Sequence, residues 1–203
     1  MPKILAIETS GSVCGVGIWQ NDKEPIIVEK IGNRIHSEKL PEFIIHSLKK
    51  SNLTINDLDA LAVSSGPGSY TGLRIGMSLA KGLAFGSGIQ LYPINTIDCI
   101  IFYLNRKYNY TILVYSHAGV VYEKNVIDNV RSDIHQVELM DIYDNPVICI
   151  NFPDNRKNIK NAEYINPSVN YIGNYTYNNF DLLDRYQLDE ISPGYYSEFN
   201  LRN

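Results

Sequence analysis

The chain has 203 residues, of which 44% are hydrophobic and 20% are charged, and its net charge is −4. A chain of this length and composition can build its own hydrophobic core, which excludes an intrinsically disordered protein and makes a structural metal or disulfide unnecessary. Lysine and arginine are scattered and slightly outnumbered by acids, which excludes a protein that grips nucleic acid by charge alone.

The beginning of the chain predicts a three-stranded antiparallel meander. Apolar runs over residues 4–8, 13–19 and 25–31 are typical of strands, and short links rich in serine, glycine, asparagine and aspartate separate them. Links this short join antiparallel neighbours, because a parallel pair needs a longer crossover connection.

An amphipathic helix is predicted next. Its apolar stripe occupies positions i, i+3, i+4, i+7 and i+8, which are Leu40, Phe43, Ile44, Ser47 and Leu48. Ser37 is the predicted N-cap, which places Pro41 close to the helix start, where proline is tolerated.

Strands and helices then alternate. The pattern predicts strands at residues 60–64 and 90–94, and helices at 70–85 and 96–104. The resulting order βββαβαβα predicts an α/β lobe over residues 1–106. Its mixed five-stranded sheet is expected to be antiparallel at one side and parallel at the other.

A second, smaller lobe is predicted over residues 107–203, where asparagine and tyrosine become frequent. Short strands are predicted at residues 111–115, 120–126, 137–142 and 147–150. The stretch 151–179 has weak periodicity, and we expect it to be mainly irregular.

A glycine-rich turn over residues 64–76 joins a predicted strand to the second helix, and two interpretations remain open. Backbone N–H groups near Gly66, Gly68 and Ser69 could bind an anion at the helix start. Alternatively, the glycines form a rigid turn and Ser69 or Thr71 caps the helix. The run matches neither a Walker loop nor a dinucleotide fingerprint, which favours the structural interpretation.

The second helix carries a row of small residues four positions apart: Gly72, Gly76, Ala80 and Ala84. Glycine inside a helix costs about 1 kcal/mol relative to alanine, so close packing or function must offset the cost. The row contacts either the lobe's own sheet and first helix or a helix of another protein. The sequence leaves both open.

The potential metal ligands form no metal motif. The histidines lack the spacing of a paired metal site: His36, His46, His117 and His135. The cysteines lie far apart and match neither zinc nor thiol-redox spacing: Cys14, Cys99 and Cys149. We therefore expect no metal site, and we expect the cysteines to be buried apolar residues in a reducing compartment.

Membrane and secretion signals are also not expected. The apolar run that begins at Ile4 meets Glu8 too early for a signal-peptide core, and no other run is long enough to span a bilayer. The sequence therefore predicts a cytoplasmic protein without a membrane segment.

Three motifs together resemble one family. They are Ile-Leu-Ala-Ile-Glu-Thr-Ser at residues 4–10, His-Ser-Glu at 36–38 and Ser-Gly-Pro-Gly-Ser-Tyr-Thr-Gly-Leu-Arg-Ile-Gly at 65–76. The chain resembles the TsaB (YeaZ) family of tRNA threonylcarbamoyladenosine biosynthesis proteins, in the actin and sugar-kinase-like (ASKHA) superfamily. The resemblance covers the first half of the chain and implies an actin/RNase H-like ASKHA fold of two lobes. The second lobe is expected to be shortened, and residues 192–202 match the family's Pro-x-Tyr-x-Arg ending only loosely.

The resemblance also implies a function. TsaB proteins are non-catalytic subunits that bind and activate the transferase TsaD, which modifies tRNA, together with the ATPase TsaE. No catalytic residue and no cofactor are then expected in this chain, because ATP belongs to the partners, and contact with tRNA is indirect. The implied TsaD contact, which could also serve a homodimer, comprises Leu40, Phe43, Ile44, Gly72, Leu73, Gly76, Met77 and Ala80.

An alternative is an independent ATP-binding ASKHA enzyme of the phosphotransferase type. In the superfamily's ATPases an acid ends the first strand and the next hairpin clamps phosphate, and Glu8, Thr9 and Ser10 stand at those positions. A simple hairpin turn is the interpretation that we favour for these residues.

Overall fold

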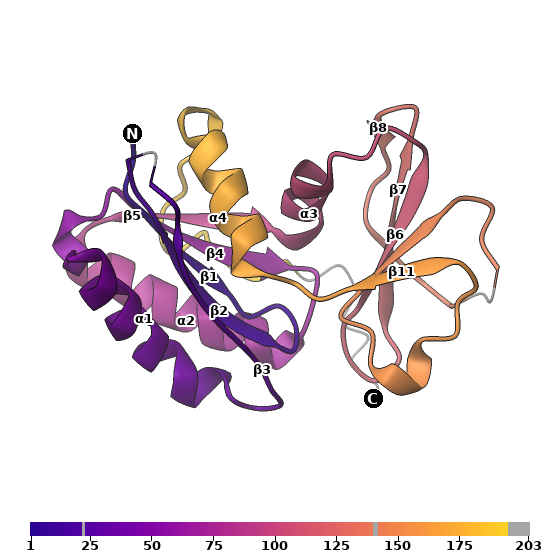
Figure 1. The fold of residues 1–203 in the computed structure, drawn as a ribbon, viewed down its shortest axis with the longest axis horizontal. Coiled ribbons are helices and arrows are strands. Elements are labelled where there is room, and N and C mark those ends of the chain that lie inside the picture. The colour runs from indigo at the N-terminus through magenta and orange to yellow at the C-terminus, as the bar shows by residue number, and fades with distance from the viewer. Residues whose placement is uncertain (22, 140–141, 195–203) are drawn as a thin grey trace.

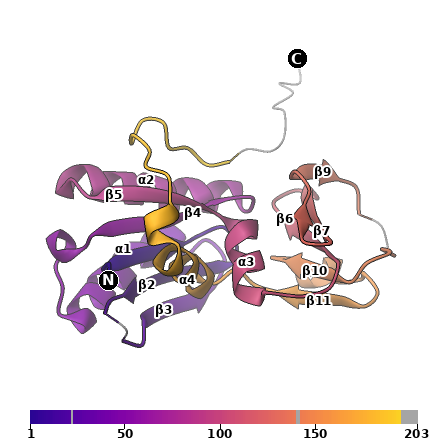
Figure 2. The ribbon, with the colours of Figure 1, turned by 90° about the horizontal axis from the view of Figure 1, so that it is seen from above.

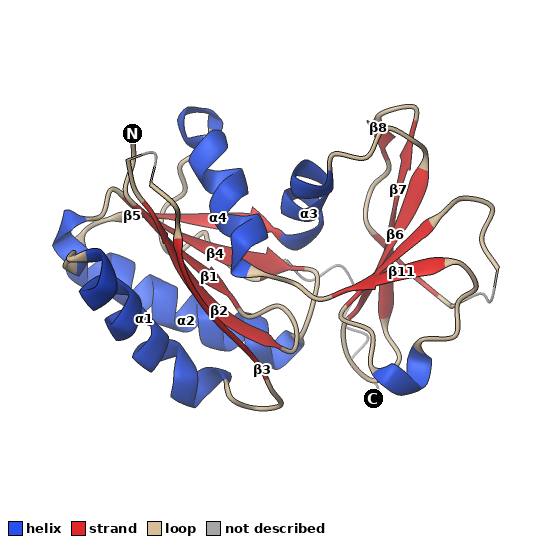
Figure 3. Ribbon diagram, in the orientation of Figure 1, coloured by secondary structure: helices blue, strands red, loops and turns tan. Residues whose placement is uncertain are grey.

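A computed structural model describes residues 1–21, 23–139 and 142–194. The chain forms two lobes, each built on one mixed sheet, and the α-helices pack on the sheet of the first lobe (Figures 1 and 3). The predicted two-lobed α/β architecture is therefore confirmed.

The sheet of the first lobe has the order β3-β2-β1-β4-β5. Its strands are β1 (Ile4–Glu8), β2 (Val13–Trp19), β3 (Ile26–Ile31), β4 (Ala60–Gly66) and β5 (Gln90–Asn95). The pairs β1–β2 and β2–β3 are antiparallel, whereas β1–β4 and β4–β5 are parallel, as the element order predicts.

Helices cover both faces of this sheet. On one face lie α1 (His36–Ser51) and α2 (Tyr70–Ser87), and on the other lie α3 (Thr96–Leu104) and α4 (Val169–Asn178) (Figure 1). Leu5 and Ile7 of β1 pack in the core on the α1–α2 side, whereas Ile4 and Ala6 pack in the core on the α3–α4 side. A strand buried on both faces has no polar alternation, which explains the continuous apolar run at the start of the chain.

The sheet of the second lobe has the order β11-β10-β6-β7-β8, with β9 paired to β7. Its strands are β6 (Tyr110–Tyr115), β7 (Val121–Ile127), β8 (Val130–Arg131), β9 (His135–Val137), β10 (Val147–Ile150) and β11 (Ala162–Ile165). Short 3₁₀ turns occur at Ile55–Asp57, Asp154–Arg156 and Phe180–Leu182.

The prediction that residues 151–179 are mainly irregular is wrong, because β11 and α4 lie within them. Tertiary contacts stabilise α4 where its own pattern is weak. A Cβ atom on Gly173 would lie 2.0 Å from the Trp19 ring, so this glycine lets α4 sit directly on β2. At the helix start, Ser168 accepts a hydrogen bond from the Asn170 N–H and donates one to the Glu29 carboxylate at 3.1 Å.

The chain returns to the first lobe after β11, which differs from the predicted division into residues 1–106 and 107–203. Besides α4, the segment 183–194 runs back along the first lobe (Figure 2). There the Lys81 ammonium donates to the Ile191 carbonyl at 2.6 Å, and the Gly194 N–H donates to the Ser65 carbonyl at 2.7 Å.

Smaller differences concern element ends. The N-cap of α1 is Ile35 rather than Ser37. Of the described residues 137–139 and 142 in the predicted strand 137–142, only residue 137 lies in a strand, and residues 140–141 lie outside the described ranges. Residues 195–202 of the predicted family ending lie outside the described residues.

The expectations about cysteines and metal ligands can be compared with the described residues. All three cysteines are buried and free. No group of three or more histidine, cysteine, aspartate or glutamate side chains within the described ranges could hold a metal ion. No helix in the same ranges is long and apolar enough to cross a membrane.

Candidate functional site

The glycine-rich turn packs against the turn between β1 and β2. A Cβ atom on Gly68 would lie 2.3 Å from the Ser10 carbonyl oxygen, and the Ser69 N–H donates to that same oxygen at 2.6 Å. The Ser69 side chain caps α2 by accepting a hydrogen bond from the Gly72 N–H at 3.3 Å. Gly68 therefore lets the glycine-rich turn lie directly against the backbone of the β1–β2 turn, as the interpretation of these glycines as a rigid turn predicts.

The small-residue row of α2 is also used inside the lobe. A Cβ atom on Gly72 would lie 2.1 Å from the Thr9 carbonyl oxygen, and one on Gly76 would lie 2.2 Å from Thr9 Oγ1. Ala80 and Ala84 are buried in the same core. Of the two interpretations left open by the sequence, contact within the lobe is correct.

Burial corrects the predicted partner-contact residues. Seven of the eight are buried within the first lobe: Leu40, Ile44, Gly72, Leu73, Gly76, Met77 and Ala80. Phe43 is partly exposed. The physical reason is that these residues form the sides of α1 and α2 that face the sheet, so the hydrophobic stripe indicates the core side rather than the docking side.

A groove between α1 and α2 remains open on the outside of the lobe. We call it the outer groove. It has a volume of about 520 Å³ and is lined by His36, Ser37, Leu40, Pro41, Arg74, Ile75, Ser78 and Leu79. On the same two helices, Phe85 of α2 is 83% exposed and Ile45 of α1 is 68% exposed. Large apolar side chains this exposed, on helices that also line an apolar groove, are typical of an interaction surface.

The exposed side of α2 has small residues of its own. Ser78 and Gly82 are exposed and four positions apart, and Gly86 follows after another four. Cβ atoms on Gly82 and Gly86 would meet nothing within 4 Å. The sequence analysis missed this second row, although its four-residue spacing is as visible as that of the first.

Glu8 is a buried acid at the end of β1. It is 1% exposed, and its carboxylate accepts a hydrogen bond from the Ser10 N–H. Burial raises the pKa of Glu8 to about 7, because the hydrogen bonds from Ser10 and Ser64 offset only part of the desolvation and the negative charge of Glu29 adds to it. Glu8 therefore carries a proton during part of the physiological pH range.

The raised pKa predicts how stability depends on pH. Unfolding returns the Glu8 pKa to its usual 4.5, so the folded state keeps a proton that the unfolded state loses, and stability falls as pH rises from about 4.5 to about 7. Glu8→Gln mimics the neutral acid. We expect the variant to match the wild type near pH 4 and to exceed it at pH 8 by on the order of 3 kcal/mol. Urea unfolding at both pH values measures this, and equal stabilities of the two proteins at pH 8 would contradict the raised pKa of Glu8.

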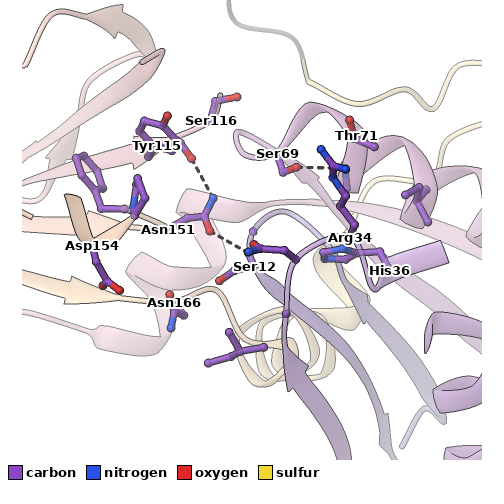
Figure 4. A pocket seen from close by; sticks show the side chains of 18 of the residues that line it. Ser12, Arg34, His36, Ser69, Thr71, Tyr115, Ser116, Asn151, Asp154 and Asn166 are labelled. Carbon is purple, nitrogen blue, oxygen red and sulfur yellow. Dashed lines mark hydrogen bonds between the residues drawn. The ribbon is translucent and has the colours of Figure 1, made fainter. Parts of the chain in front are cut away.

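A cleft of about 880 Å³ lies between the lobes (Figure 4). Asn151 joins its two sides, since its Oδ1 accepts from the Ser12 N–H at 2.9 Å and its Nδ2 donates to the Tyr115 carbonyl at 3.2 Å. Of the residues in the anion-loop prediction, only Ser69 lines the cleft. The other five are buried beneath it: Glu8, Thr9, Ser10, Gly66 and Gly68.

A serine and a histidine meet at the edge of this cleft. Ser116 Oγ lies 2.9 Å from His117 Nδ1 and 2.6 Å from the Gly68 carbonyl oxygen. A carbonyl can only accept, so the serine proton points at Gly68 and the histidine must donate to Oγ. The imidazole therefore does not accept the hydroxyl proton, and the pair connects the second lobe to the glycine-rich turn instead of forming an activated nucleophile.

Comparisons with known proteins find similar sequences and a similar fold. The family model described as "TsaD: tRNA N6-adenosine threonylcarbamoyltransferase" matches residues 26–120. The TsaB protein of Haemophilus influenzae is 34% identical over 134 residues, which are 64% of this chain and 56% of that protein. The TsaB protein of Escherichia coli is 35% identical over 95 residues, which are 47% of this chain and 41% of that protein. The structure of YeaZ from Pseudomonas aeruginosa superposes with a TM-score of 0.71 and 14% identity, over 96% of this chain and 100% of that one.

The two lobes, the mixed first sheet and the superposition show that the chain has the fold of YeaZ from Pseudomonas aeruginosa. In sequence, the chain is similar to TsaB proteins and to the TsaD family over its first part. It spans about half the length of the curated TsaB relatives that it matches.

Proposed function

We propose that the chain is a non-catalytic subunit in the biosynthesis of tRNA threonylcarbamoyladenosine. In this role it docks on a TsaD-type transferase and acts with a TsaE-type ATPase, which bring the ATP and the catalytic groups. The names of the TsaB relatives support the pathway, and the match to the TsaD family model supports a common ancestry with the transferase. The scattered charge of the chain supports an indirect role toward tRNA.

The outer groove is the observation that carries the proposal. A transferase with an ASKHA lobe of its own would present helices, and helices pack by placing side-chain ridges into grooves. Ile75 and Leu79 supply apolar area in the groove, while Ser78 and Gly82 let a partner backbone approach closely. A second copy of this chain could use the same face when the transferase is absent.

The independent ATP-dependent enzyme is the weaker alternative. In the glycine-rich turn, the Ser69 N–H is bonded to Ser10, and the space beside Gly68 and Gly72 is filled by the β1–β2 turn. A phosphate group would have to displace these contacts. We therefore favour a docking subunit over a phosphotransferase.

A reconstituted modification assay tests the proposed function. The chain is omitted from, or added to, a mixture of the TsaD-type transferase, the TsaE-type ATPase, the enzyme that supplies the threonylcarbamoyl group, ATP and tRNA. We expect modified adenosine to accumulate at least tenfold faster with the chain present, and the chain alone to give no product. An unchanged rate, with all proteins folded, would contradict the proposal.

A further inference from the structure

Hydrogen bonds within the chain bridge the cleft between the lobes. Asn151 follows β10 in the second lobe, and its Oδ1 accepts a hydrogen bond from the N–H of Ser12, in the β1–β2 turn, at 2.9 Å (Figure 4). A second bridge runs from the buried hydroxyl of Ser116, which follows β6, to the Gly68 carbonyl oxygen in the glycine-rich turn at 2.6 Å. The second lobe is therefore attached to two turns of the first lobe that pack against each other.

The backbone on both sides of the Asn151 bridge allows the close approach. Asn151 has a φ of 61°, in the left-handed region that asparagine adopts more readily than most residues. Its Nδ2 donates to the Tyr115 carbonyl at 3.2 Å, which fixes the orientation of the amide. Across the cleft, a Cβ atom on Gly11 would lie 2.7 Å from Asn151 Oδ1 and 2.8 Å from Pro167 Cγ. A larger residue at position 11 would push the lobes apart, so two positions far apart in the sequence fit the same bridge.

The lobes are also joined along α3, which lies between the two sheets (Figure 1). Ile100 of α3 belongs to one apolar core with Ile112 of β6 and Ile148 of β10. Asp98 of α3 lies 3.0 Å from the ammonium group of Lys124 on β7, and Lys124 is buried. None of the described residues that line the cleft belongs to α3. The lobes are thus attached at two separate places, along α3 and across the cleft.

Attachment at two places restricts movement of the lobes. In a hinge motion, one rigid part rotates against another about a few residues, and the far side of the cleft must be free to move. Here a rotation about α3 would break both bridges and separate Gly11 from Asn151 and Pro167. The contacts therefore favour a single opening of the cleft.

The Ser116 bridge also reaches the start of α2. The Gly68 carbonyl and the Ser69 N–H belong to one planar peptide group. The second lobe holds this group through Ser116, and the β1–β2 turn holds it through the Ser10 carbonyl oxygen, which accepts from the Ser69 N–H at 2.6 Å. Ser69 is the N-cap of α2, so the position of this peptide group sets where the helix begins.

We propose that Asn151 and Ser116 form a latch that fixes the opening of the cleft. The two lobes then move as one body, and the second lobe braces the start of α2. The latch does not rest on the proposed function, because it concerns the free chain.

Distances between two spin labels, measured by electron paramagnetic resonance, test the latch in the free chain. Glu38→Cys and Asn155→Cys place labels on opposite sides of the cleft, since both residues are exposed and adjoin residues that line it. The native cysteines are buried and are not expected to react. We expect one narrow distance distribution in the otherwise wild-type chain. Combining Asn151→Gly with Ser116→Ala is expected to shift it to longer distances and to broaden it.

Two further variants make the comparison specific. Asn166→Gly makes the same change as Asn151→Gly at an exposed asparagine that lines the cleft, and it is expected to leave the distances unchanged. Gly11→Ala adds one methyl group against Asn151 and is expected to shift the distances in the same direction as loss of the latch. It keeps the test decisive if the double variant does not fold.

Hydrogen exchange over residues 66–73 tests the brace. We expect the amides of this segment to exchange several-fold faster in Ser116→Ala than in the wild type, and exchange at the wild-type rate in the folded variant would show that the second lobe does not brace α2. A broad or two-peaked distance distribution in the wild-type background would overturn the latch, as would equal distributions in the double variant and in Asn166→Gly.

Discussion

Gly72→Ala is expected to destabilise the protein strongly, whereas Gly82→Ala is expected to stabilise it. Both changes add a methyl group within α2, where alanine is favoured over glycine by about 1 kcal/mol. At Gly72 the added Cβ would lie 2.1 Å from the Thr9 carbonyl oxygen, so backbone must move, and overpacking of this kind costs about 3 kcal/mol. At Gly82 the added atom meets nothing within 4 Å.

Chemical denaturation of the three proteins measures the difference. The net expectation is a loss of about 2 kcal/mol or more for Gly72→Ala and a gain of up to about 1 kcal/mol for Gly82→Ala. Both substitutions replace glycine by alanine inside the same helix, so a difference in stability between the two variants cannot come from helix propensity. If both variants gained stability, the tight contact between α2 and the β1–β2 turn would be refuted.

Ser78→Arg is expected to abolish docking to a TsaD-type transferase while leaving the fold intact. Ser78 is exposed on α2 and lines the outer groove, so arginine has room in the free protein. In a complex it would place a long, charged side chain where helices must approach closely, and a buried unpaired charge at a central contact weakens binding by about a hundredfold or more.

Affinity measurement by calorimetry or surface plasmon resonance tests this prediction. Asn158→Arg is the control, since it adds the same side chain at an exposed residue of the second lobe. Circular dichroism verifies that both variants are folded. Wild-type affinity of Ser78→Arg would show that the transferase, if it binds, uses another surface.

Most of the first lobe was predictable from the sequence because its signals are local. The strands Ile4–Glu8 and Val13–Trp19 and the helix Thr96–Leu104 match their predicted ranges. Each combines an apolar pattern with a turn or cap at its ends. In α3, for example, Asn95 accepts hydrogen bonds from the N–H groups of Ile97 and Asp98.

The helix α4 could not be predicted, because its stability comes from residues far away in the chain. The Glu29 carboxylate on β3 accepts hydrogen bonds from the N-terminus of α4, and Gly173 of α4 packs against the Trp19 ring on β2. Neither contact leaves a periodic signal among the asparagines and tyrosines around α4.

The docking residues were misplaced for a related reason. Apolar periodicity identifies the side of a helix that is buried, and it does not distinguish burial in the lobe from burial against a partner. Gly72 and Gly76 proved to accommodate Thr9, whereas the surface that remains free includes Ser78, Gly82 and Phe85. The β1–β2 turn lies against Gly72 and Gly76, so their row is buried, and the row of Ser78 and Gly82 stays at the surface.

Hydroxyl-radical footprinting of Phe85 tests the proposed docking face most directly. Phe85 is 83% exposed on α2, whereas Tyr108, 49% exposed near the second lobe, serves as the internal reference. When the TsaD-type transferase is added, we expect oxidation of Phe85 to fall several-fold and that of Tyr108 to stay constant. A stable complex in which Phe85 is oxidised as fast as in the free chain would contradict docking through the outer surface of α1 and α2.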